Sequence, residues 1–198
     1  MQDNFQIIAF FTLAKPGCRP YENEKCFYED LPEFIGKHSS RIKRVIHHQS
    51  GGHFLQNLSS EDLSGTECNR HLRIRVQNTE IQSVLDFLNN LANLTEIYWL
   101  GPFIEAQKDL NSPHNWFNNT RISADTKEKF TFLDDIILEK SSRYNTIKYI
   151  STYNVIGANR DYLYTEDCIL WNDLDHLSLC GEVIIADLQK KFLAGLMN

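Results

Sequence analysis

The sequence predicts an α/β protein, a three-layer α/β/α domain built around a mainly parallel sheet. Two observations predict this fold. Apolar strand-like segments alternate with amphipathic helical segments through most of the chain. In addition, a helix-like run from residue 81 is followed by the apolar segment Ile97 to Leu100, and Gly101-Pro102 ends that segment. This order is typical of a helix–strand–loop unit in such a sheet. Ligands of open α/β sheets bind at the loops that follow the strands.

The overall composition restricts the classes of protein and partner. The chain has 198 residues, of which 42% are hydrophobic, and this suits one domain over residues 1–198. A net charge of −6 argues against nucleic acid as a partner, because binding phosphates needs a basic surface. No apolar run reaches the roughly 18 residues of a membrane span, so we expect no transmembrane segment. No signal peptide is evident, and the chain taken literally is cytoplasmic.

In the first half of the chain, apolar pattern and turn residues delimit the expected elements. Phe5 to Leu13 reads as a buried parallel strand, and a Pro- and Gly-containing loop over residues 15–20 ends it. Residues 27–38 are expected to be helical. Residues 42–48 are expected to form a second strand, followed by the loop Gln49-Ser50-Gly51-Gly52.

In the second half, the period of the apolar residues changes from two to 3.6. Residues 71–77 alternate like a half-solvated strand. From Thr79, a plausible N-cap, one helical stripe carries Ile81, Val84, Leu85, Leu88 and Leu91. The remaining expectations are a loop or short helix at 111–119, a helix at 125–138, a strand at 147–150 continuing to 155–156, and an amphipathic helix at 183–196.

The most informative stretch is Asp173-Leu174-Asp175-His176-Leu177-Ser178, just before the last helix. An Asp three residues before a His can fold back to Nδ1 and orient the imidazole for proton transfer. Asp175 is the adjacent alternative, but an immediate neighbour usually points elsewhere, so we favour Asp173. The competing interpretation is a helix N-terminus that an Asp caps, with His176 incidental.

Three other groups of residues are of types that can form functional sites. His47, His48 and His53 offer no convincing ligand set, because neighbours on a strand face opposite ways, and no C-x-x-C occurs, so no metal site is predicted. The backbone N–H groups at Gly51 and Gly52 are weak candidates for stabilising an oxyanion. Cys18 and Cys26 bracket a loop that a disulfide can close, although five cysteines leave at least one unpaired.

The block Cys168 to Gly181 (CILWNDLDHLSLCG) resembles the last block of SGNH hydrolase-like domains, which have a flavodoxin-like fold. More specifically, it is similar to the SGNH domain of acyltransferase-3-type membrane O-acyltransferases, which acylate cell-surface saccharides. The resemblance implies that Asp173 and His176 are catalytic. It extends loosely to the loop at Cys18 to Pro20 and to the segment from Ile81 to Pro102.

The chain also departs from the family's pattern. The family's nucleophile is the Ser of a Gly-Asp-Ser block after the first strand, and no Gly-Asp-Ser occurs here. We therefore expect an SGNH-like domain that is incomplete at its N-terminus and lacks the first strand. Gly17 matches the block-two glycine, an oxyanion donor, by location alone. The block-three Asn has no clear counterpart, and Ser50 is a weak substitute for the nucleophile.

Two functions follow from these observations. The first is the C-terminal portion of a Ser-His-Asp O-acyltransferase acting on lipopolysaccharide or peptidoglycan, without a cofactor. Its partners would be a saccharide acceptor, an acyl donor and a membrane acyltransferase, at the periplasmic face of the inner membrane, where Cys18 and Cys26 can be oxidised. The second is a non-catalytic remnant, a pseudoenzyme that binds saccharide or a protein partner.

Overall fold

The computed structural model describes most of the chain between residues 18 and 197. The described residues are 18–20, 26–58, 68–69, 71–106, 121–153, 163, 165–173 and 176–197. The strand expected over residues 5–13 lies outside these ranges, and so does the loop or short helix expected at 111–119. The prediction that the domain lacks its first strand therefore stays a prediction.

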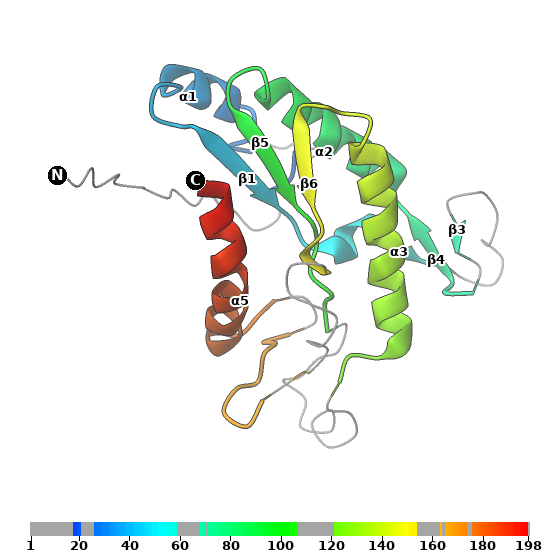
Figure 1. Ribbon diagram of the computed structural model, residues 1–198. Coiled ribbons are helices and arrows are strands. Elements are labelled where there is room, and N and C mark those ends of the chain that lie inside the picture. Colours follow the sequence, from blue (N-terminus) through cyan, green and yellow to red (C-terminus); the bar gives the residue numbers. More distant parts are fainter. Residues whose placement is uncertain are drawn as a thin grey trace.

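A parallel three-stranded sheet forms the centre of the molecule (Figure 1). Its strands are β1 (Arg44–His48), β5 (Glu96–Leu100) and β6 (Ile147–Ile150), in the order β1-β5-β6. Val45 pairs with Ile97, which in turn pairs with Ile147, so apolar residues of all three strands form one row. Three parallel neighbours require crossover connections, and these contain the helices.

Helices lie on both sides of this sheet. α1 (Leu31–Lys37), α2 (Asn78–Leu91) and α3 (Ala124–Ser141) share one apolar core with it, whereas α5 (Leu179–Met197) stands on the side away from α2 and α3 (Figure 1). The predicted three-layer α/β/α class with a mainly parallel sheet is confirmed.

The main core lies between the sheet and α2 and α3. All five residues of the predicted α2 stripe are fully buried there. They pack with Trp99 of β5, which is also fully buried, and with Leu133 and Ile137 of α3. Burying such side chains is worth roughly 1.5–3 kcal/mol each, which explains why the period-3.6 pattern predicted this helix well.

A second, small sheet is antiparallel and was not expected from the sequence. It contains β2 (Leu55–Asn57), β4 (Ile74–Val76) and β3 (Cys68–Asn69) in the order β2-β4-β3, and the 3₁₀ helix η1 (Gly51–Phe54) leads into it. β4 is therefore shorter than the strand expected over residues 71–77. Residues 71–73 form a turn, in which Arg73 has φ of 50°.

Several expected boundaries are wrong, each for a local reason. The helix expected at 27–38 starts only at Leu31, after a turn, because Pro32 is favourable in a first helical turn. Thr79 lies inside α2, whose N-cap is Gln77. The strand β6 ends at Ile150, and Thr152 and Tyr153 are already helical, so the strand does not run on through residues 151–153. Residues 155–156 lie outside the described ranges. α5 begins four residues before the predicted position 183.

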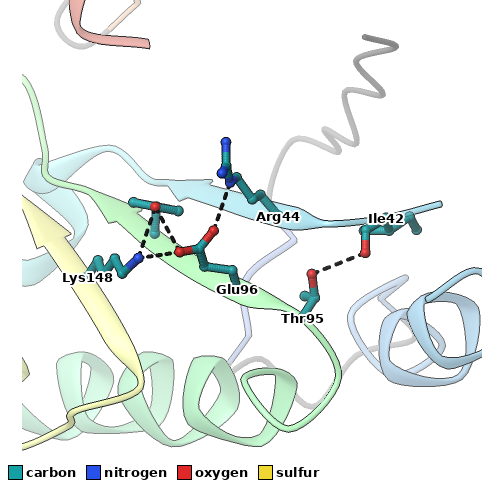
Figure 2. Close-up of polar contacts among 6 residues, drawn as sticks. Ile42, Arg44, Thr95, Glu96 and Lys148 are labelled. Carbon is teal, nitrogen blue, oxygen red and sulfur yellow. Dashed lines mark hydrogen bonds and ion pairs between the residues drawn. The ribbon is translucent and has the colours of Figure 1, made fainter. Parts of the chain in front are cut away.

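The sheet surface opposite α2 carries charged side chains at the beginning of the strands (Figure 2). Glu96 accepts hydrogen bonds from Arg44 Nε at 2.7 Å and from Lys148, and the Tyr98 hydroxyl donates to it at 3.0 Å. Lys148 also lies over the Tyr98 ring. These contacts, the Lys148 and Arg44 hydrogen bonds foremost, lower the pKa of Glu96 to about 2. This end of the sheet is therefore a solvated, ion-paired surface.

Candidate active site

Residues 170–172 and 176–178, just before α5, pair as the two arms of a short hairpin. Trp171 and Leu177 form an antiparallel bridge, and the backbone N–H of Asn172 donates to the His176 carbonyl at 2.8 Å. Trp171 is buried and Leu177 packs beside it in a second apolar cluster, made of Ala106, Ile122, Leu163, Cys168, Leu170 and Trp171. The base of the hairpin is thus anchored, and its tip carries Asp173 and His176.

Asp173 and His176 are in direct contact at this tip. The Asp173 carboxylate accepts the backbone N–H of His176 at 2.8 Å, and His176 Nδ1 lies 2.9 and 3.0 Å from its two oxygens. This is the fold-back contact that the i, i+3 spacing suggested. A carboxylate accepts hydrogen bonds, so the geometry assigns the Nδ1 position a proton and leaves Nε2 as the basic nitrogen. The two side chains are 36% and 72% exposed, respectively.

The residues that follow fix where α5 starts. Ser178 Oγ accepts the N–H of Gly181 at 3.0 Å, as an N-cap does, and donates to the carbonyl of Ile169. Gly181 packs directly on the preceding segment, because a Cβ at this position would lie 2.1 Å from the Leu170 carbonyl oxygen. The Leu-Ser-x-x-Gly part of the motif is therefore explained by the junction between hairpin and helix.

A disulfide joins the two ends of this segment. Cys168 and Cys180 are bonded, with 6.0 Å between their Cα atoms. Sequence reasoning missed this pair, although the two cysteines flank the Asp173–His176 motif almost symmetrically. It also missed the capping role of Ser178, for which a Ser directly before an apolar helix was the available signal.

The loop after β1 lies at the carboxyl edge of the sheet and is organised by a buried carboxylate. Glu105, 2% exposed, accepts the Ser50 hydroxyl at 2.6 Å and the Gly52 N–H at 3.0 Å. Gly51 is buried, and a Cβ there would lie 2.6 Å from the Pro102 side chain. Close packing thus accounts for glycine at position 51. The oxyanion role predicted for Gly51 stays a prediction, as does that of Gly17, which lies outside the described residues.

The three histidines of this region do not come together. His47 is buried between Tyr28 and Trp99, whereas the ring of His48 faces Phe103 on the opposite side of the sheet. His53 instead contacts Arg19, whose Nη2 lies 2.9 Å from its Nδ1. Across the described ranges, no group of three His, Cys, Asp or Glu side chains is arranged to hold a metal ion.

The other cysteine pair considered from the sequence is also joined. Cys18 and Cys26 form a disulfide, with 5.7 Å between their Cα atoms. The described residues thus contain two disulfides, one between Cys18 and Cys26 and one at the Asp173–His176 hairpin. None of the described helices is both long enough and apolar enough to cross a membrane.

Comparisons with known proteins add little to this geometry. No protein-family model and no curated protein matches the chain. One similar solved structure is described as "The structure of a putative platelet activating factor from Streptococcus pneumonia". It aligns with 84% of this chain and 92% of its own, at 14% identity and a TM-score of 0.40. Similarity at this level assigns neither a family nor a function, so the functional interpretation depends on the site.

Proposed function

We propose that this chain supplies the histidine–aspartate pair of a hydrolase-like acyl-transfer domain. The contact between Asp173 and His176 Nδ1 carries the proposal. A carboxylate at Nδ1 holds the imidazole in the tautomer whose Nε2 can accept a proton. The pair lies at the tip of a hairpin, and both side chains are accessible to a substrate.

The proposed reaction is acyl transfer through a serine. His176 Nε2 takes the proton of the attacking hydroxyl, the Asp173 carboxylate stabilises the resulting imidazolium, and the proton then passes to the leaving group. The serine belongs to a Gly-Asp-Ser block, a tripeptide that these 198 residues do not contain. Without that block, the same pair can still act as a general base toward water.

The finer assignment is O-acylation of a cell-surface saccharide. It follows the resemblance of the Cys168 to Gly181 block to the domain of membrane O-acyltransferases. The two disulfides support a location outside the reducing cytosol, because such bonds persist mainly in oxidising compartments. We therefore propose the periplasmic face of the inner membrane as the place of action.

Hydrolysis of p-nitrophenyl acetate by the purified chain tests the acid–base role. We expect His176→Ala to lower the rate on the order of 10²-fold, the usual contribution of a positioned general base. His71→Ala is the matched control, because His71 is also exposed but lies in the turn before β4. It should leave the rate unchanged.

An equal rate for the wild type and His176→Ala would overturn the acid–base proposal and favour the alternative, a non-catalytic domain that binds saccharide or a partner. The saccharide assignment needs a separate assay, in which the chain is combined with a protein that supplies the Gly-Asp-Ser block. Mass spectrometry of an oligosaccharide acceptor should show the mass of one acetyl group added, and His176→Ala should abolish it.

A further inference from the structure

The hairpin that carries Asp173 and His176 is closed by a covalent bond. Cys168 and Cys180 are 12 residues apart, and both residues of the pair lie between them. Within the described residues, this disulfide is the only covalent cross-link in the segment between β6 and the end of α5. Any movement of one arm of the hairpin relative to the other is therefore limited by this bond.

The two bonded cysteines lie in different surroundings. Cys168 is 8% exposed and belongs to the second apolar cluster, whereas Cys180 lies in the first turn of α5, at the surface. Leu179 and Val183 on that helix are 81% and 59% exposed, whereas Gly181 is buried against Leu170. The disulfide thus attaches a poorly buried helix start to a buried cluster.

Besides the Trp171–Leu177 bridge and the Asn172–His176 hydrogen bond, several non-covalent contacts of this junction involve Ser178 and Gly181. Ser178 bonds to the backbone of Ile169, Leu170 and Gly181, and Gly181 fits only because it lacks a side chain against Leu170. These contacts join the hairpin arms at their base, next to the disulfide. The Asp173–His176 contact itself is exposed, and exposed pairs contribute little to their own geometry.

We propose that the Cys168–Cys180 disulfide is the positioning element of the Asp173–His176 pair, and that its reduction switches the pair off. This inference rests on the proposed function. In the oxidised chain the bond holds the arms so that Asp173 meets His176 Nδ1. In the reduced chain only the non-covalent contacts of Ser178 and Gly181 hold the start of α5 to the preceding segment, so the arms can shift and the carboxylate no longer selects one tautomer of the imidazole.

The redox step needs a dithiol as the reductant. One thiolate of the dithiol attacks a sulfur of the Cys168–Cys180 bond, which breaks that bond and forms a mixed disulfide. The second thiolate then closes the reductant into its own disulfide. Two electrons and two protons pass to the chain, which is left with two thiols. Dithiothreitol serves as the probe in solution.

The chain offers a matched control in its other disulfide. Cys18 and Cys26 are 8 positions apart, and neither Asp173 nor His176 lies between them. Two double variants therefore separate the specific effect from a general loss of cross-links. They are Cys168→Ser with Cys180→Ser, and Cys18→Ser with Cys26→Ser.

Nitrogen-15 NMR of the histidine rings reads out the position of His176 without depending on catalysis. In the wild type, we expect the two ring nitrogens of His176 to show the distinct shifts of one Nδ1–H tautomer. In the Cys168/Cys180 variant the two shifts should move toward each other, as the tautomers mix. In the Cys18/Cys26 variant they should stay as in the wild type. His176→Gln assigns the signal.

The hydrolysis assay adds a kinetic readout. We expect the Cys168/Cys180 variant to lose roughly tenfold in kcat with little change in KM, because the pair is misplaced rather than the substrate excluded. If the NMR shifts change but His176→Ala has no effect on the rate, the positioning inference stands and the proposed function fails. Unchanged His176 shifts in a folded Cys168/Cys180 variant would overturn the inference.

A reductive titration keeps the test decisive if that variant does not fold. Wild-type chain is treated with increasing dithiothreitol, free thiols are alkylated, and mass spectrometry gives the reduced fraction of each disulfide. The change in the His176 signal should follow the reduced fraction of Cys168–Cys180. A change that follows Cys18–Cys26, or neither bond, would contradict the proposal.

Discussion

Two histidines of this chain have opposite environments. His47, on β1, is 6% exposed, and its Nε2 has no hydrogen-bond partner among the described residues. Burial, with a smaller effect of neighbouring His48, lowers the pKa of His47 to about 3, so this ring stays neutral. His176 lies at the tip of an exposed hairpin, where a carboxylate orients it.

The difference shows what makes a histidine useful for proton transfer. A ring whose charged form is strongly disfavoured behaves as an apolar aromatic side chain, and His47 packs edge-on against Trp99 as one. A ring that is exposed and has a carboxylate at Nδ1 can take and return a proton. The residue type alone does not distinguish these two cases. The burial of the ring and its hydrogen-bond partner distinguish them.

Removing the Asp173 carboxylate, the partner of His176, is the strongest test of the comparison between His176 and His47. We expect Asp173→Asn to lower the rate of p-nitrophenyl acetate hydrolysis by about 10²-fold, because an amide can hold His176 in the wrong tautomer and does not stabilise an imidazolium. KM should change little. Asp167→Asn, an exposed carboxylate before the hairpin, is the control. A rate within twofold of the wild type would show that Asp173 only shapes the turn.

Disturbing the base of the hairpin should have the next largest effect. In Gly181→Ala the new Cβ meets the Leu170 carbonyl oxygen at 2.1 Å, and the backbone has to shift. We expect a loss of about 1–3 kcal/mol in the free energy of unfolding, measured with urea. The control in the same helix, Gly195→Ala, has open space and should stabilise by roughly 0.5–1 kcal/mol. Equal effects of the two changes would contradict the packing described at Gly181.

The buried histidine makes stability depend on pH. In the unfolded chain His47 has its ordinary pKa of 6.5, and in the folded chain about 3. The unfolded state therefore binds more protons between these values, so stability is lost as the pH falls from about 6.5 toward about 3. In His47→Phe this penalty is absent, and the variant should gain about 2 kcal/mol relative to the wild type between pH 7 and pH 5. Parallel stability curves would show that His47 titrates normally.

The exposed ion pairs at Glu96 provide the smallest expected effect. The lowered pKa of Glu96 means that its contribution is present above about pH 4.5 and is lost as the pH falls toward about 2. Its side chain is 34% exposed, so solvent screening keeps that contribution below about 1 kcal/mol. Glu96→Gln should cost this much at low salt and almost nothing in 1 M NaCl. A salt-independent loss would contradict a screened surface pair.

The elements that the sequence predicted best are those with a strict apolar period. The α2 stripe and the strands β1, β5 and β6 form because their apolar side chains are buried. The spacing of apolar residues in the sequence reports this burial directly. The predicted ends of elements were wrong where a single residue decides them, as Pro32 does in the first turn of α1. The small antiparallel sheet was missed because β2 and β4 have three residues each, too few to show a period.

At the candidate site, local contacts were predictable and long-range ones were not. The spacing of Asp173 and His176 suggested their contact because only three residues separate them. Glu105 reaches Ser50 across 55 positions, and no spacing rule connects such residues. The pairing of Cys168 with Cys180 was local, but five cysteines permit many pairings, and only the approach of α5 to Leu170 selects this one.

The Cys168–Cys180 disulfide also determines how the molecule behaves after its backbone is cleaved within the hairpin. A protease that cuts the backbone between Cys168 and Cys180 produces two polypeptides, yet the bond between these two cysteines keeps them tied together. Such a nicked molecule would migrate as one species in a denaturing gel and separate only after reduction. The helix α5 would therefore remain attached to the rest of the protein even when it no longer belongs to the same chain.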